Sequence, residues 1–395
     1  MAGSGQMSFV FLLFHSIAFL GCYFSAVFRI SHPSCCADFI TVQTASGDIE
    51  LTEAPLRILI TGGAGFIGRR IARHLLEQNT FQCEGEPPRT IGTIILFDVT
   101  AGDQMPVDPR IEIRVGDIGD EKTMVDITRK VDLVWHLAAV VSSAAEADFD
   151  LGMRVNLHGL LHLLEGIRRS NSERSGAETS RPHKVRLVYA SGFAVLGGEL
   201  PSVVTDYTAP TPKSSYGMQK AVGELLVADY SRRGFIDGRT LRLPTITVRP
   251  GKPNKAASTF VSSIIREPLN GQRAVCPVTP DTVVYVLSPR RALEAMLRAM
   301  SMADAALGEE RTLPLPGLTV RVSDMVESLR RAAGDAACQL IEWLPDPTIQ
   351  RIVESWPTTV EAARATRLGF SADTNFDAIV AAHLEDEQIF QSTSH

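Results

Sequence analysis

A glycine-rich segment between an apolar run and an amphipathic run most restricts what this chain can fold into. Three glycines are spaced three residues apart directly after the apolar run 56–61, and apolar residues recur at helical spacing over residues 67–75. Glycines at a strand-to-helix turn let the backbone turn tightly and approach a pyrophosphate, which then lies at the helix N-terminus. We therefore expect a dinucleotide site lined by Gly62, Gly65, Phe66, Ile67 and Gly68.

The alternation of strand and helix continues through the first 250 residues. Short apolar runs predict further buried strands at residues 93–97, 111–115, 131–137 and 185–189. Helical patterns include residues 148–169 and 216–232, and two polar inserts, 79–92 and 170–184, are expected to form surface loops. This order predicts an α/β fold, a doubly wound parallel sheet of the Rossmann type with a smaller C-terminal substrate lobe.

Length and composition set the expected domain organisation. A chain of 395 residues that is 45% hydrophobic can bury one large core or two modest ones. We expect an apolar segment and linker over residues 1–54, a Rossmann domain that binds NAD over 55–249, a mostly substrate-binding lobe over 250–385, and a tail over 386–395. The net charge is −6 without a concentrated basic stretch, so no nucleic-acid partner is expected. The cysteines and histidines lack zinc spacing, so no metal site is expected either.

The N-terminus holds an apolar run from Phe9 to Phe28 that is about long enough to span a membrane. No Lys or Arg precedes the run, and Arg29 follows it at once. A secretory signal, which normally starts with basic residues, fits this pattern poorly. A single-pass anchor with the catalytic domain in the cytosol fits better. A mispredicted first exon, with a cytoplasmic enzyme, is the alternative.

Two acidic positions follow predicted strands and suggest contacts to a nucleotide. Asp98 comes directly after the strand at 93–97, where a carboxylate binds both ribose hydroxyls and repels a 2′-phosphate, which favours NAD over NADP. Asp117 follows the next strand and could bind the adenine amino group while Ile118 packs on the ring. A helix N-cap is the alternative role for Asp117.

Tyr216 and Lys220 form the motif with the clearest chemistry. They are four residues apart on a predicted helix, so their side chains lie on one face. A phenol with a pKa near 10 is a poor base at neutral pH, but an adjacent ammonium or an oxidised nicotinamide ring lowers that pKa. The pair predicts proton transfer by Tyr216, with Lys220 also holding the ribose of the nucleotide.

With these motifs, the chain over residues 56–385 resembles the extended short-chain dehydrogenase/reductases, the NAD-dependent class that includes sugar-nucleotide epimerases and dehydratases. Segments 242–246, 248–258 and 265–269 are most similar to the D-erythronate dehydrogenases of that class. The resemblance implies that Asn156 supports Lys220 or a water molecule, and that the small Ala138 lets the cofactor cross the strand at 131–137. It also implies that Ser191 carries the catalytic hydroxyl.

The sequence departs from the pattern of that family after Ser191. The family commonly has two hydroxyl residues in tandem, the second of which points at the substrate, whereas Gly192 follows Ser191 here. Either Ser191 takes the role, or the reacting carbonyl loses one hydrogen-bond donor. Loss of such a donor costs about 3 kcal/mol of transition-state stabilisation.

The resemblance implies an NAD-dependent dehydrogenase that oxidises a secondary alcohol of a small polyhydroxy acid, such as D-erythronate. Epimerisation, dehydration or ketone reduction of a larger metabolite is one alternative, and a non-catalytic NAD sensor is another. A homodimer packed through the helices at 148–169 and 216–232 is expected. The candidates for binding the substrate are Ser191, Asn254, Lys255, Ser258 and Arg266.

Overall fold

The computed structural model describes residues 39–43, 49–175, 184–251 and 256–392. The chain divides into two compact units, Met1–Ala54 and Pro55–His395. Strands β1 (Phe39–Gln43) and β2 (Ile49–Glu53) form an antiparallel hairpin in the first unit. The predicted anchor from Phe9 to Phe28 lies outside the described residues. Within the described ranges, the helices are all too short or too polar to cross a membrane.

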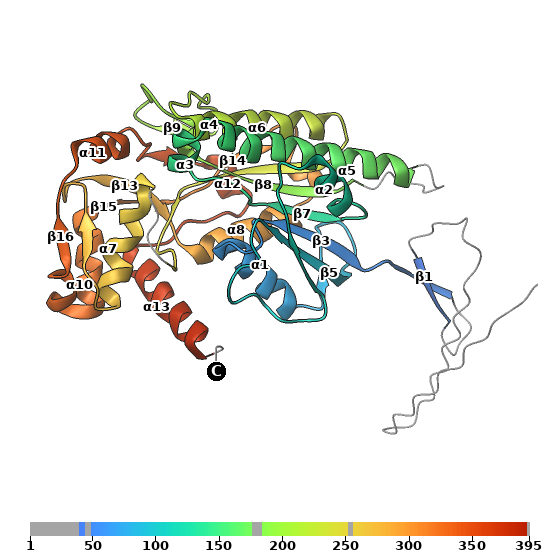
Figure 1. Ribbon diagram of the computed structural model, residues 1–395, viewed down its shortest axis with the longest axis horizontal. Helices are drawn as coiled ribbons and strands as arrows, with labels where there is room; N and C mark the ends of the chain where they lie inside the picture. Colours follow the sequence, from blue (N-terminus) through green and yellow to red (C-terminus); the bar gives the residue numbers. More distant parts are fainter. Residues whose placement is uncertain (1–38, 44–48, 176–183, 252–255, 393–395) are drawn as a thin grey trace, which may run out of the picture. The chain divides into compact units, whose positions relative to one another are not determined.

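The second unit is organised around an eight-stranded sheet (Figure 1). Its strands are β3 (Leu56–Thr61), β4 (Thr80–Phe81), β5 (Arg89–Asp98), β6 (Ile111–Val115), β7 (Leu133–His136), β8 (Arg186–Gly192), β10 (Asp237–Leu243) and β14 (Thr312–Pro314). The order is β14-β10-β8-β7-β3-β5-β4, with β6 also paired to β5. The pairs are parallel except for β4 with β5, which is antiparallel. The prediction of a doubly wound parallel sheet is confirmed.

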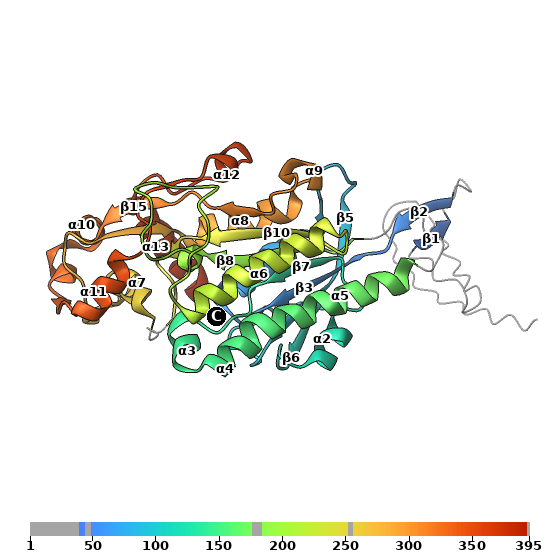
Figure 2. The same cartoon turned by 90° about the horizontal axis from the view of Figure 1, so that it is seen from above.

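Helices cover both faces of this sheet, which explains the continuous apolar runs of its strands. On one face lie α1 (Phe66–Glu77) and α8 (Pro289–Ser301), whose buried residues share a core with those of β3 and β5. The other face is covered by α2 (Glu121–Ile127), α5 (Gly159–Ser175) and α6 (Ser215–Arg232). Figure 2 shows α5 and α6 side by side over that face.

The residues after 243 form a second core beside the sheet. Its strands are β11 (Thr245–Ile246), β12 (Ala274–Cys276), β13 (Val283–Leu287), β15 (Leu318–Arg321) and β16 (Ile341–Trp343). They pack with α7 (Phe260–Leu269), α10 (Val322–Cys338), α11 (Pro347–Glu354) and α13 (Phe376–Ser392). Strand β14 and helix α8 return to the large sheet. The division at residue 249 therefore stays a prediction, because the same unit contains both sides of it.

Short elements complete the second unit. They are α3 (Ser142–Ala147), α4 (Phe149–Gly152), η1 (Met153–His158), η2 (Phe193–Val195), β9 (Val204–Thr205), η3 (Ala257–Thr259), α9 (Asp304–Leu307), β17 (Val360–Glu361) and α12 (Ala363–Arg367). The insert at 79–92, expected as a loop, contains β4 and the first residues of β5. Ile91 of this insert pairs with Leu56 of β3 and is buried, which a polar, proline-containing sequence did not indicate.

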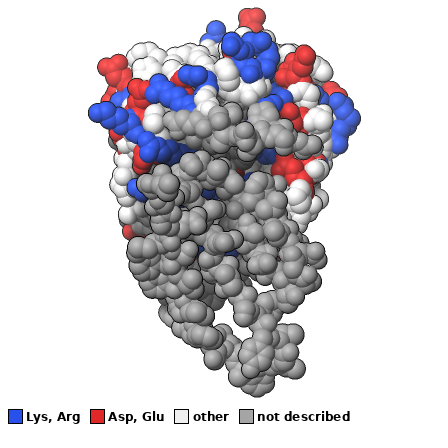
Figure 3. All heavy atoms as spheres, turned by 90° about the vertical axis from the view of Figure 1, so that its right-hand side faces the viewer, with Lys and Arg blue, Asp and Glu red and all other residues white. Residues whose placement is uncertain are grey.

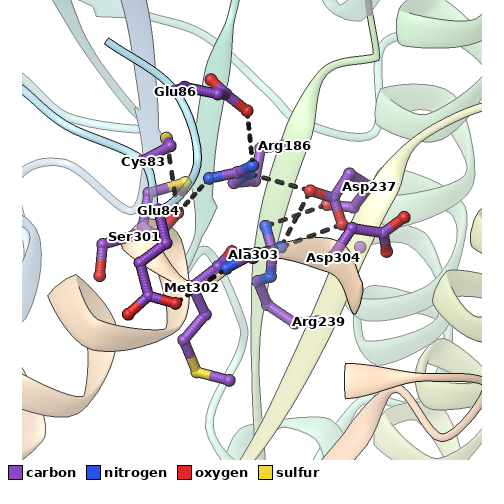
Figure 4. Close-up of polar contacts among 12 residues, drawn as sticks. Cys83, Glu84, Glu86, Arg186, Asp237, Arg239, Ser301, Met302, Ala303 and Asp304 are labelled. Carbon is purple, nitrogen blue, oxygen red and sulfur yellow. Dashed lines mark hydrogen bonds and ion pairs between the residues drawn. The ribbon is translucent and has the colours of Figure 1, made fainter. Parts of the chain in front are cut away.

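A network of charges with a buried centre and two half-exposed members, Glu86 and Asp304, joins the amino ends of β8, β10 and β14 (Figure 4). We call it the amino-end ion cluster, and its members are Glu86, Arg186, Asp237, Arg239, Asp304 and Arg311. The carboxylate of Asp237 lies 2.9 Å from Arg186 Nε, 2.9 Å from Arg239 Nη2 and 3.4 Å from Arg311 Nη1. Glu86 of the 79–92 insert pairs with Arg186 at 3.0 Å, so the insert is tied to the sheet.

The surface shown in Figure 3 mixes charges of both signs. Lys and Arg side chains lie among Asp and Glu side chains over the described part of this face. Nucleic-acid binding requires a concentrated basic footprint. This face, where described, does not present one.

Candidate active site

The strand order reverses between β3 and β7, and the carboxyl ends of these strands border the crevice where ligands bind in such sheets. Gly62 directly follows β3 and has a φ of +71°, a conformation that favours glycine. A Cβ on Gly62 would lie 2.8 Å from the backbone nitrogen of Ala138 after β7. The turn therefore requires glycine for both conformation and space.

The start of α1 fits the pyrophosphate of a dinucleotide. Gly65 is its N-cap residue, and no side chain caps this end, so the positive end of the helix dipole can receive an anion. A Cβ on Gly68 would lie 2.5 Å from the carbonyl oxygen of Gly62, so only glycine permits this close packing. Phe66 and Ile67 are half-buried in the first turn of the helix. The structure thus brings the predicted glycine loop into one cradle.

Asp98 is the last residue of β5 and is fixed beside that cradle. Its Oδ2 accepts a hydrogen bond of 3.0 Å from the backbone of Ala64, and its Oδ1 accepts one of 2.8 Å from Val99. The carboxylate is therefore anchored to the glycine loop at the place predicted for ribose recognition. That recognition stays a prediction.

Asp117 and Ile118 lie after β6 in surroundings that differ from the expected ones. Asp117 accepts a hydrogen bond from the backbone of Gly119 and pairs with Arg154, while Asp120 is the N-cap residue of α2. Ile118 is buried in the core with α2 and α5. Contacts of these two residues with adenine stay predictions.

Tyr216 and Lys220 lie together on α6 at the carboxyl end of β8. The N-terminus of the helix is capped by Ser214, which accepts a hydrogen bond from the backbone of Gly217. Lys220 Nζ donates to the carbonyl oxygen of Ala190 at 2.8 Å and lies 5.7 Å from the ring centroid of Tyr216. The position of the ammonium is thus fixed by the backbone of β8.

Burial dominates the protonation of this pair in the protein alone. It raises the pKa of Tyr216 to about 12 and lowers the pKa of Lys220 to about 8. The expected lowering of the Tyr216 pKa, which needs positive charge beside the phenol to offset this burial, stays a prediction. An oxidised nicotinamide ring supplies such a charge when it is bound.

Asn156 connects the segment after β7 to α6. It lies in η1, a π-helical turn, where its Oδ1 accepts a 2.8 Å hydrogen bond from the backbone of Val140. Its Nδ2 donates to Gln219 Oε1 at 2.7 Å. Gln219 precedes Lys220 and is fully buried, so Asn156 supports α6 through it. Sequence reasoning missed Gln219, for which only its place beside Lys220 was a signal.

Ser191 is the second-last residue of β8, and its side chain is hydrogen-bonded to α6. Its Oγ donates to Glu224 Oε1 at 2.6 Å. The same carboxylate forms a bidentate ion pair with Arg242, with Nη2 to Oε2 at 2.7 Å and Nε to Oε1 at 3.0 Å. Among the described residues, the carbonyl oxygen of Leu243 is the atom that a Cβ on the neighbouring Gly192 would approach, at 3.5 Å. Sequence reasoning missed Glu224 and Arg242, although Glu224 follows Lys220 by one helical turn.

The candidate substrate residues are only partly described. Arg266 is buried on α7, where its guanidinium donates to the carbonyl oxygen of Arg249 at 2.6 Å and to Glu267 at 2.5 Å. Ser258 is half-buried in η3. Asn254 and Lys255 lie outside the described residues. Their roles in binding a substrate stay predictions.

Comparison with known proteins agrees with this geometry. The model of the NAD dependent epimerase/dehydratase family matches residues 58–303. D-erythronate dehydrogenase of Cupriavidus necator is 48% identical over 332 residues, which cover 84% of this chain and 98% of the relative. The Haemophilus influenzae protein of the same name is 40% identical and covers 84% of this chain and 99% of its own.

A solved structure also shares the fold of this chain. The crystal structure of the nucleoside-diphosphate-sugar epimerase from Agrobacterium tumefaciens superposes with a TM-score of 0.77 at 38% identity, over 87% of this chain and 98% of that one. The predictions of the superfamily and of NAD as cofactor are confirmed. The chain belongs to the NAD dependent epimerase/dehydratase family and is an NAD-dependent dehydrogenase of the extended short-chain dehydrogenase/reductase type.

Proposed function

We propose that this protein oxidises a secondary alcohol of a small polyhydroxy acid of the D-erythronate class, with NAD as the electron acceptor. The observation that carries the proposal is the 48% identity to a D-erythronate dehydrogenase over 98% of that relative. The placement of Tyr216 and Lys220 at the carboxyl end of β8 supports it, because this edge of the sheet borders the nucleotide cradle.

In the proposed reaction, the phenol oxygen of Tyr216 takes the proton of the substrate hydroxyl. Bound NAD supplies the ring that accepts the hydride. Lys220, fixed on the carbonyl oxygen of Ala190, holds the ribose and places positive charge beside the phenol. Asn156 and Gln219 keep the helix that carries both residues in place. Ser191 was predicted to orient the carbonyl, but its Oγ donates to Glu224. We therefore give Ser191 no role at the substrate and assign the chemistry to Tyr216 and Lys220 alone.

The carboxylate of the substrate needs a cation or hydrogen-bond donors. For this role we propose Asn254, Lys255 and Ser258, with Arg266 as a further candidate. Arg266 is already paired with Glu267, so it reaches a substrate only by exchanging that partner.

A homodimer through α5 and α6 is part of the proposal. Leu225 on α6 is 70% exposed and Phe149 on α4 is 53% exposed, and a partner subunit would bury both. The run from Phe9 to Phe28 is proposed as a membrane anchor for a catalytic domain in the cytosol, with a cytoplasmic enzyme as the alternative.

Epimerisation of a larger metabolite is the second candidate function. It is favoured by one observation, the 38% identity to a chain described as a nucleoside-diphosphate-sugar epimerase. The two candidates differ in their products, because an epimerase returns its NAD to the oxidised form within each turnover.

The deciding experiment measures NADH formation by the purified protein with D-erythronate and other sugar acids of four to six carbons. Tyr216→Phe is the matched variant, since it removes one hydroxyl and keeps the ring. We expect NADH with D-erythronate, and a turnover about 10²–10⁴-fold lower in the variant at nearly unchanged NAD affinity. Absence of NADH with every acid, together with interconversion of a nucleoside-diphosphate sugar, would support the epimerase instead.

A further inference from the structure

Three residues beneath the catalytic pair form a buried polar unit that the proposed chemistry does not use. Ser191 is the second-last residue of β8, Glu224 lies on α6 and Arg242 lies on β10, and all three side chains are nearly inaccessible to solvent. The carboxylate of Glu224 receives the Ser191 hydroxyl at 2.6 Å and two nitrogens of Arg242 at 3.0 Å or less. We call this unit the Glu224 clamp. It ties two neighbouring strands to the helix that carries Tyr216 and Lys220.

The clamp also determines the charge around Lys220. The groups that face the ammonium are Tyr216 and Glu224 from α6, Tyr189 from β8 and His136 from β7. Burial raises the pKa of Tyr189 well above its usual value and lowers the pKa of His136 to about 3, so both are neutral at pH 7. Among the described residues facing Lys220, Glu224 is therefore the anion that offsets the burial of the ammonium.

The direction of the Ser191 side chain follows from the strand. Successive side chains of a strand point to opposite faces, so Tyr189 and Ser191 point to the same side. Tyr189 packs against Lys220 and against Gly223 of α6, which identifies that side as the one covered by α6. The Ser191 hydroxyl lies on this covered side and already donates its proton to a carboxylate. It has no second proton to donate to a substrate carbonyl.

We propose that Glu224, held by Arg242 and Ser191, is a positioning residue that keeps Lys220 cationic, and that the Ser191 hydroxyl serves this clamp and not the substrate. The inference rests on the proposed function only where turnover is measured. Its first consequence, the charge of Lys220, is read from NAD binding alone.

The experiment compares wild type, Glu224→Gln, Glu224→Asp and Ser191→Ala in the full-length protein. NAD affinity is measured between pH 6 and 10 by quenching of protein fluorescence, and turnover of D-erythronate is measured over the same range. In the wild type we expect NAD affinity to fall as Lys220 loses its proton near pH 8. Glu224→Gln removes the charge and keeps the shape, so the midpoint moves to lower pH by about half a unit or more. Glu224→Asp keeps the charge and leaves the midpoint in place.

Ser191→Ala separates the clamp from direct catalysis. If Ser191 serves the clamp, Ser191→Ala leaves the midpoint of NAD binding unchanged. It lowers turnover by less than about tenfold, because the substrate loses no hydrogen-bond donor and Glu224 is only held less firmly. If Ser191 instead donated a hydrogen bond to the substrate carbonyl, Ser191→Ala would lower turnover by about 10²–10³-fold. Should Glu224→Gln fail to fold because Arg242 is left unpaired, Arg242→Gln is the second variant: it removes the cation that is paired with Glu224, so the midpoint moves to higher pH.

Two results would overturn the inference. One is an unchanged NAD-binding midpoint in a folded Glu224→Gln or Arg242→Gln variant. The other is a loss of turnover of 10²-fold or more in Ser191→Ala with an intact NAD affinity. A wild-type protein that binds NAD with this midpoint but oxidises no sugar acid contradicts the proposed function alone.

Discussion

Replacing Asp237 with Asn tests how much the amino-end ion cluster stabilises the fold. The side chain of Asp237 is only 7% exposed and that of Arg239 is fully buried. Asn keeps the shape and one acceptor oxygen but removes the negative charge that three guanidinium groups share. Arg186 and Arg311 keep carboxylate partners in Glu86 and Asp304, at 3.0 and 2.5 Å. Arg239 loses its carboxylate partner and is left with neutral acceptors, the amide oxygen of the new Asn and the backbone oxygens of residue 237 and Met302.

The expected magnitude follows from that uncompensated guanidinium. Removing one partner of a buried ion pair costs about 3–5 kcal/mol of unfolding free energy. Burial has already lowered the pKa of Arg239 to about 10, and Asp237 is the group that opposes this effect. We therefore expect the loss of unfolding free energy in Asp237→Asn to fall within that range. Surface ion pairs typically contribute about 0–1 kcal/mol, and we expect a loss of that size for the half-exposed Asp304.

The assay is urea unfolding at pH 7, followed by circular dichroism, for wild type, Asp237→Asn and the control Asp304→Asn. NAD affinity of the folded variants serves as a second control and should not change, because the cluster lies at the amino ends of the strands. A loss below about 1 kcal/mol in Asp237→Asn, equal to that in the control, would refute the reasoning.

Three further predictions follow from the described contacts. Burial lowers the pKa of His136 to about 3, so below pH 6.5 the unfolded chain binds a proton that the folded chain does not. The free energy of unfolding therefore falls as the pH falls, by about 2 kcal/mol for this histidine at pH 5. His136→Gln should reduce the pH dependence of the free energy of unfolding, measured between pH 6.5 and 5. Asp98→Ser should narrow the preference for NAD over NADP in binding titrations, and equal affinities in the wild type would contradict the ribose assignment. Gly192→Ser should raise turnover by adding a hydrogen-bond donor at a position where, in the described part of the chain, a Cβ would approach Leu243 alone; steady-state kinetics showing no gain would count against a missing donor.

Local patterns in the sequence were sufficient to predict the sheet and to place Tyr216 and Lys220 together on one helix. The strand before Gly62, the helix after it and the i, i+4 spacing of Tyr216 and Lys220 are all set within a few residues of chain. The polar partners were not predictable in this way. Asn156 meets Gln219 across 63 positions, and Glu224 meets Arg242 across 18, so only the packing of α6 on the sheet brings them together.

Apolar residues beside the nucleotide site were ambiguous for a different reason. An isoleucine after a strand suits a core as well as the face of an adenine ring, and Ile118 is buried among α2 and α5. The insert at 79–92 was similarly misleading, because its glycines and prolines indicate loops while its last residues pair with β4. Composition alone does not show which polar segments gain strand partners.

The amino-end ion cluster has a consequence for how proteins of this kind diversify. It fastens the first residues of β8 and β10, whereas the nucleotide cradle, Tyr216 and the open position at Gly192 follow the opposite ends of the strands. Substitutions in the segments after β7, β8 and β10 can therefore alter substrate preference without reaching the cluster. Mutant libraries confined to those segments should retain folded protein, and a lineage can change its metabolic role while its scaffold stays the same.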